Sequence, residues 1–180
     1  MKTREVTLPD GQRVQVPQGI QRIDSSSTHG WQVRYQGTKL FSDGEAADPM
    51  KSLANAISEL LARMHSDPLP TTIKQRPSIN KSSDLPAGIS GPIVRQRAGR
   101  LPTADLSVLL PRFGRKAEIR NVYIGSQRTY TPERYLASLD KCVALRHIAI
   151  ERYEQDARKA RKAAIAVLKS QLQALRAPGK

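Results

Sequence analysis

Arginine, lysine and glutamine are the side chains in this sequence whose number and spacing indicate a chemical role. That role is the binding of a polyanion. The 180 residues contain 30 Lys and Arg against 16 Asp and Glu, which gives a formal net charge of +14. Each nucleic-acid phosphate that is neutralised by a cation releases a condensed counterion, and this release favours binding. Arg can also pair with guanine and Gln with adenine. The composition therefore predicts a nucleic-acid partner.

The positive charge is concentrated in the second half of the chain. Residues 1–65 hold 8 Lys and Arg against 7 acids, whereas residues 91–180 hold 19 against 7. Such clustering favours a binding surface, although any single residue could instead be a solvated charge that keeps the protein in solution. The DNA-binding side chains expected in this half are Arg95, Arg97, Arg100, Arg112, Arg115, Lys116 and Arg120.

Other chemistry finds little support in the sequence. His29, His65 and His147 have no Cys or acidic partners at metal-ligand spacing, and neither a Gly-rich phosphate loop nor a nucleophile motif is present. Cys142 lies in a helical stretch, where a buried packing role is expected. We expect no enzyme activity, no metal, no cofactor and no small-molecule substrate. No apolar run is long enough to span a membrane, so we expect a cytoplasmic protein in the nucleoid with no membrane partner.

The first residues alternate between apolar and polar side chains. The runs Glu5–Leu8 and Arg13–Val16 flank the turn sequence Pro9-Asp10-Gly11, which predicts a β-hairpin over residues 1–17. The apolar face of this hairpin would be formed by Val6, Leu8, Val14 and Val16.

Residues 18–65 are expected to form a small sheet-helix module. Short alternating segments at 19–24, 31–36 and 38–41 predict an antiparallel meander, and from about Ala47 an apolar period of three to four residues predicts a helix. That helix must cover one face of the sheet. In the middle segment, Trp31, Val33 and Tyr35 would point toward the helix, and Gln32, Arg34 and Gln36 would point away from it.

The same module resembles a known family. The strings Gly19-Ile20-x-Arg22-Ile23-Asp24, Gly30-Trp31-x-Val33-Arg34 and Phe41-Ser42-Asp43 precede a helix with Ser52-Leu53-Ala54 and Ala56. They look like the bacterial and mobile-element branch of the APETALA-two/ethylene-response-factor DNA-binding domain. The resemblance implies a sheet that lies in the DNA major groove with a helix packed behind it. It also implies that Gln32, Arg34 and Gln36 face bases and phosphates, with Lys39 beside them.

A second module is expected after a linker. Residues 66–87 contain four prolines and no apolar period, which predicts an extended linker, with a structured connection lying across one module as the alternative. Three strand-like segments within residues 88–125 then precede another helix. This order predicts a second, more basic and more diverged copy of the module over residues 88–150.

The last helix is expected to be long. Thr131-Pro132-Glu133 is typical of a helix start, and no Pro or Gly follows before Pro178, so up to about 45 residues could be helical. Residues 151–180 would form a basic helical extension with no domain to cover its apolar side chains. Pairing with a second copy would cover them, and the alternative is an exposed basic tail. The predicted homodimer contacts are Ile165, Leu168, Leu172 and Leu175.

These elements predict an α+β fold with two modules, each a three-stranded antiparallel sheet packed on one helix, plus an N-terminal hairpin and a long C-terminal helix. The expected function is double-stranded DNA binding, as a transcriptional regulator or a nucleoid-associated architectural protein that reads the major groove with β-sheets. Two alternatives remain open. One is an RNA-binding protein, against which the scarcity of solvent-facing aromatics argues. The other is a protein-interaction adaptor that works through its long helix.

Overall fold

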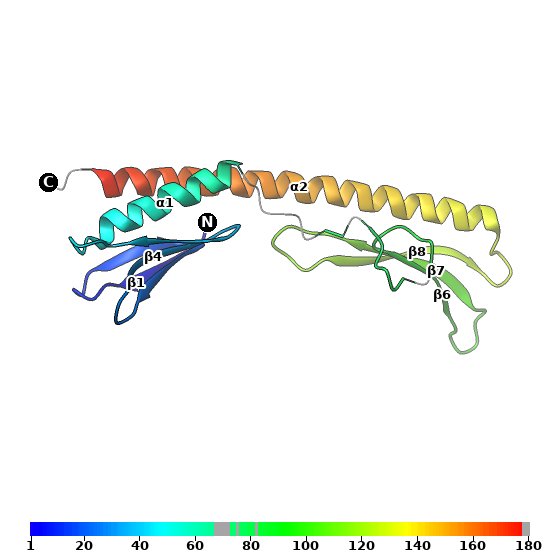
Figure 1. Ribbon diagram of the computed structural model, residues 1–180. Helices are drawn as coiled ribbons and strands as arrows, with labels where there is room; N and C mark the ends of the chain where they lie inside the picture. The colour runs from blue at the N-terminus through cyan, green and yellow to red at the C-terminus, as the bar shows by residue number, and fades with distance from the viewer. Residues whose placement is uncertain (67–72, 75, 82, 178–180) are drawn as a thin grey trace. The chain divides into compact units, whose positions relative to one another are not determined.

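The computed structural model describes residues 1–66, 73–74, 76–81 and 83–177, and it has an α+β fold with three antiparallel sheets and two helices (Figure 1). Contacts divide the chain into two units. The first comprises Met1–Pro70 and Lys159–Lys180, and the second comprises Thr71–Arg158. The long C-terminal helix α2 (Pro132–Arg176) contributes residues to both units. Each unit has its own apolar core.

The first unit contains the expected hairpin and the expected three-stranded sheet with its helix. The sheet has the strand order β3-β4-β5, and helix α1 packs on it. The elements are β1 (Thr3–Thr7), β2 (Arg13–Pro17), β3 (Ile20–Asp24), β4 (His29–Arg34), β5 (Thr38–Ser42) and α1 (Pro49–Ser66).

The apolar periods explain how these elements assemble. Trp31 and Val33 are fully buried between the sheet and α1, as the alternation in β4 predicts. The apolar face predicted for the hairpin is confirmed, because Leu8, Val14 and Val16 are buried in the same core and Val6 packs against it. Helix α1 begins after Asp48, whose carboxylate accepts hydrogen bonds from the backbone N–H groups of Met50 and Lys51 at 3.1 and 2.9 Å.

The end of α2 also belongs to this core, and the expectation that its apolar side chains lack cover is wrong. Leu168 is fully buried within the first unit, and Ile165, Leu172 and Leu175 pack against the same cluster. Figure 1 shows this part of α2, in red, beside α1. Arg161 joins the two helices by donating hydrogen bonds to the carbonyls of Met64 at 2.6 Å and His65 at 2.8 Å. The physical reason for expecting a dimer through these residues is therefore removed.

An ion cluster joins β3 to the start of α1. The guanidinium of Arg22 lies 5.2 Å from the centre of the Trp31 ring and pairs with Asp24 and Asp43, each at 2.7 Å. Asp43 also accepts a hydrogen bond from Ser52 of α1 at 2.5 Å. Burial alone would lower the pKa of Arg22, but the hydrogen bonds and charges of the two aspartates outweigh burial and raise it.

Acid is expected to destabilise this cluster. The hydrogen bond from Arg22 lowers the pKa of Asp24 below its ordinary 3.8, burial opposes this effect, and His29 reinforces it. The stabilisation is therefore present above the ordinary pKa and is lost as the pH falls through the lower folded-state pKa. Urea unfolding followed by the fluorescence of Trp31, the one tryptophan of the chain, should show a falling midpoint below about pH 4. An Asp24→Asn variant with an unchanged pH dependence would contradict this assignment.

The second unit packs one sheet on the first part of α2. Its strands are β6 (Ile89–Arg95), β7 (Thr103–Leu110) and β8 (Glu118–Ser126), in the order β6-β7-β8. The core includes Leu106 and Val108 from β7 and Cys142 from α2. Burial raises the pKa of the Cys142 thiol, which agrees with the packing role expected for this residue.

Part of the segment expected to be a linker packs on the second unit. Residues 67–72, 75 and 82 of the predicted linker lie outside the described residues. Leu85 and Ala87 are buried, and Lys81 donates hydrogen bonds to the carbonyls of Leu85, Pro86 and Ile89 at 2.6 to 2.8 Å. This described part fits the alternative of a structured connection better than a free linker.

Candidate nucleic-acid interface

The sheet of the second unit has one face that α2 does not cover, which we call the outer face. In β7, Ala104, Leu106, Val108 and Leu110 are buried on the α2 side, so the residues between them point outward. Register then places Tyr123 opposite Asp105 and Asn121 opposite Ser107 on this face. The outer face therefore carries polar and aromatic side chains from adjacent strands.

A shallow hollow of about 340 Å³ lies on the outer face near the β6–β7 turn. We call it the basic hollow. Arginines form one side of it, and the exposed side chains of β8 form the other. Its lining consists of Arg95, Arg97, Arg100, Leu101, Thr103, Asp105, Asn121 and Tyr123.

The arginines of the basic hollow are held by a closed turn that extends away from α2 (Figure 1). The N–H of Arg100 donates to the carbonyl of Arg97 at 3.1 Å, and the Gln96 side chain donates to the carbonyl of Arg100 at 3.0 Å. Arg95 pairs with Asp105 at 3.3 Å, whereas Arg97 and Arg100 have no acidic partner in the described part of the chain. Two positive charges are thus available to an anionic ligand.

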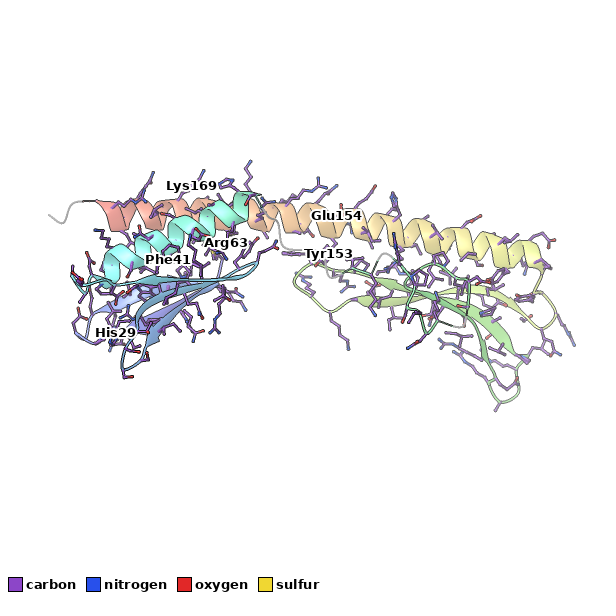
Figure 2. The ribbon with its side chains drawn as sticks, in the orientation of Figure 1. His29, Phe41, Arg63, Tyr153, Glu154 and Lys169 are labelled. Atoms are coloured by element: carbon purple, nitrogen blue, oxygen red, sulfur yellow. The ribbon has the colours of Figure 1, made fainter. Side chains whose placement is uncertain are left out.

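The other basic residues predicted in this half lie elsewhere. Arg112, Arg115 and Lys116 belong to the turn between β7 and β8, at the opposite end of an eight-residue strand that spans about 25 Å. The tip of this turn packs on α2, since the rings of Phe113 and Tyr153 meet edge to face at 5.5 Å. Figure 2 labels Tyr153. The sequence-predicted cations therefore do not form one continuous patch.

Arg120 is a correction to the expected interface. It pairs in register with Val108, whose side chain is fully buried, so Arg120 projects on the α2 side and not on the outer face. Arg112 and Arg120 both form ion pairs with Glu118, which neutralises part of their charge. Pairing with one carboxylate makes either residue a weaker ligand for phosphate.

The first sheet differs from the expectation at two of its four predicted positions. Gln32 and Arg34 do lie on the face away from α1, where the Arg34 guanidinium donates to the Gln32 side chain at 2.5 Å. Gln36 lies beyond the end of β4, in a turn with φ of 50°. Lys39 is opposite Val33 and therefore lies on the α1 side, where it pairs with Glu59 at 3.0 Å.

Asn121 and Tyr123 are candidate functional residues that the sequence reasoning missed. The Tyr123 side chain is 53% exposed on the edge strand of the outer face, and Asn121 lies two residues before it. The sequence does indicate that Asn121 and Tyr123 face outward, because they alternate with the apolar residues Val122 and Ile124, which are buried. The strand was predicted from that alternation, but its faces were not assigned.

Among the described residues, no helix combines the length and apolar character that a membrane span requires, and no three His, Cys, Asp or Glu side chains meet in a metal-binding group. The resemblance to the APETALA-two/ethylene-response-factor domain stays a prediction. Neither a protein-family model, nor a curated protein, nor a solved structure matches this chain.

Proposed function

We propose that this protein binds double-stranded DNA through the basic hollow and the adjoining outer face of the second sheet. The observation that supports this proposal most directly is the position of Arg97 and Arg100, two cations without acidic partners in the described chain, beside the exposed Asn121. A role as a transcriptional regulator or a nucleoid-associated architectural protein fits this activity. The first sheet, with Arg34 on its uncovered face, would add a weaker contact.

The chemistry of the hollow suits a duplex. Arginines at the end of a sheet can neutralise the phosphates that flank a groove, and this sets the position of the protein on the DNA. An amide such as Asn121 can pair with the N6 and N7 atoms of adenine in the major groove. The proposed division of labour is therefore affinity from Arg97 and Arg100 and base preference from Asn121.

Replacing Arg97 and Arg100 together by alanine should weaken binding to every duplex. Each lost phosphate contact reduces the dependence of log K on log salt by roughly 0.9, so we expect the slope to fall by roughly 2. Fluorescence anisotropy of a labelled duplex, titrated between roughly 50 and 200 mM salt, measures this slope. The matched control is Arg115→Ala with Lys116→Ala, which removes two charges at the other end of the same sheet. Equal slope changes in both double variants would remove the basic hollow as the main contact.

Tyr123 supports a second candidate, the binding of single-stranded RNA. An exposed tyrosine across the hollow from arginines can stack on an unpaired base, at roughly 1 to 3 kcal/mol per base. A Tyr123→Leu variant keeps the apolar surface but removes the aromatic ring. If this variant loses affinity for single-stranded RNA and keeps its affinity for duplex DNA, the second candidate is favoured. If the wild-type protein binds duplex DNA more tightly than single-stranded RNA, the first candidate is favoured.

A further inference from the structure

A second open surface of the second unit runs along the free edge of β8. We call it the β8–α2 groove, a cleft of about 670 Å³ between that strand and the first part of α2. The groove opens toward α2, whereas the basic hollow lies on the outer face and is bounded by the β6–β7 turn; Asn121 and Tyr123 of the edge strand line both. Its lining consists of Arg120, Asn121, Val122, Tyr123, Ile124, Arg134, Ala137, Ser138, Lys141 and Leu145.

The floor and the rim of the groove have different chemistry. The floor is apolar, because Val122 and Ile124 of β8 point toward α2 and line the groove together with Ala137 and Leu145. The rim is basic, since the lining includes Arg134, Lys141 and Arg120, of which Arg120 also pairs with Glu118 at 3.1 Å. A ligand that fills this groove must bring apolar groups to the floor and negative charge to the rim.

The strand beside the groove has a free edge. β8 is the last strand of its sheet, and the Tyr123 carbonyl accepts a hydrogen bond from Ser138 of α2 at 3.0 Å, so this carbonyl points away from β7. The register from Glu118 to Tyr123 is regular. Because backbone groups alternate in direction along a strand, the polar groups of Ile119 and Asn121 also point outward. Such an edge can pair with an added strand.

We propose that the β8–α2 groove binds an extended peptide segment that adds to the sheet as a strand beside β8 and carries apolar and acidic residues in turn at every second position, on the side that faces α2. The backbone of the peptide would pair with the outward groups of Ile119 and Asn121. Its apolar side chains would face Val122 and Leu145, and its acidic side chains would face the basic rim. The apolar floor favours a peptide over a nucleic-acid backbone, since phosphates and sugars cover apolar side chains poorly.

The test uses the full chain and a fluorescein-labelled peptide in which valine and glutamate take turns at every second position and serine fills the positions between them. We expect saturable binding below about 1 mM. The Lys141→Glu variant should weaken binding by roughly fivefold, through loss of one exposed ion pair and gain of one repulsion. The Ala137→Trp variant should abolish binding by filling the floor. The matched controls are Arg152→Glu and Ala144→Trp, which change exposed positions of α2 that do not line the groove. Both controls should bind as the wild type does.

Three results would overturn the proposal. One is the absence of binding up to about 1 mM, and another is an equal loss of binding in the groove variants and their controls. The third is equal binding of the same peptide with serine in place of each valine, because that peptide has the charge but lacks the apolar side chains. If duplex DNA displaces the peptide, and Lys141→Glu and Ala137→Trp weaken DNA binding as well, the groove is a nucleic-acid surface instead.

Discussion

Replacing Trp31 by alanine is expected to cost the first unit about 3 to 5 kcal/mol, a large part of the stability that a small domain usually has. The ring is fully buried between β4 and α1, so its removal leaves a cavity in the core. The indole N–H donates to the Pro49 carbonyl at 2.7 Å, and this link between the sheet and the start of α1 is also lost. Hydrogen exchange followed by mass spectrometry should show loss of protection over residues 1–66.

The second unit provides the control for this prediction. It has its own core, so its amides should keep their protection in the Trp31→Ala variant. Tyr123→Ala removes an aromatic ring that is exposed, and it should change the stability of either unit by less than about 0.5 kcal/mol. If Trp31→Ala leaves residues 1–66 as protected as in the wild type, the ring does not support the core as described.

The sheets and helices could be predicted because their residues repeat with the period of the element. Val14 and Val16 alternate with polar residues and lie in the core, and Trp31 and Val33 behave in the same way. The start of α2 was predictable for a local reason, since Thr131 and Pro132 have the chemistry of a helix start. Thr131 accepts the backbone N–H of Arg134 at 3.3 Å.

The cover of the last helix could not be predicted from the same periods. An apolar stripe shows that a helix face must be buried, but it does not show which surface buries it. The surface here is α1 and the hairpin, as the hydrogen bonds from Arg161 to Met64 and from Gln171 to Gln15 show. These partners lie 97 and 156 residues earlier in the chain. Only tertiary structure distinguishes this packing from pairing with a second copy.

The candidate interface was predictable in composition but not in arrangement. The clustering of cations in the sequence indicates the second unit, but the sheet face on which each side chain lies depends on strand register. Lys39 and Arg120 point toward helices because they are opposite Val33 and Val108. In β6, an irregularity between Ser90 and Ile93 changes which residues face outward. Ion pairs such as that between Arg95 and Asp105 also depend on register, so composition cannot show which charges are free.

Replacing Leu168 by glutamate should disrupt the first unit more severely than any surface change. The Leu168 side chain is fully buried among residues of α1 and the hairpin, and a carboxylate there would be an unpaired buried charge. We expect a loss of more than about 4 kcal/mol, which is exceptional for one substitution. Hydrogen exchange should show lost protection in residues 159–176 and in residues 1–66, with the second unit still protected.

Val167 provides the matched control for this last prediction, because it is the preceding residue of the same helix and is 44% exposed. Val167→Glu should leave the first unit folded, since its carboxylate can remain in water. The pair also separates packing within one chain from pairing between two chains. If Leu168 is covered by its own chain, Leu168→Glu lowers the stability of the first unit and does not change the oligomeric state of the protein. If sedimentation shows that Leu168→Glu converts a dimer to a folded monomer, a second copy covers this residue, and the intramolecular core described for α2 is wrong.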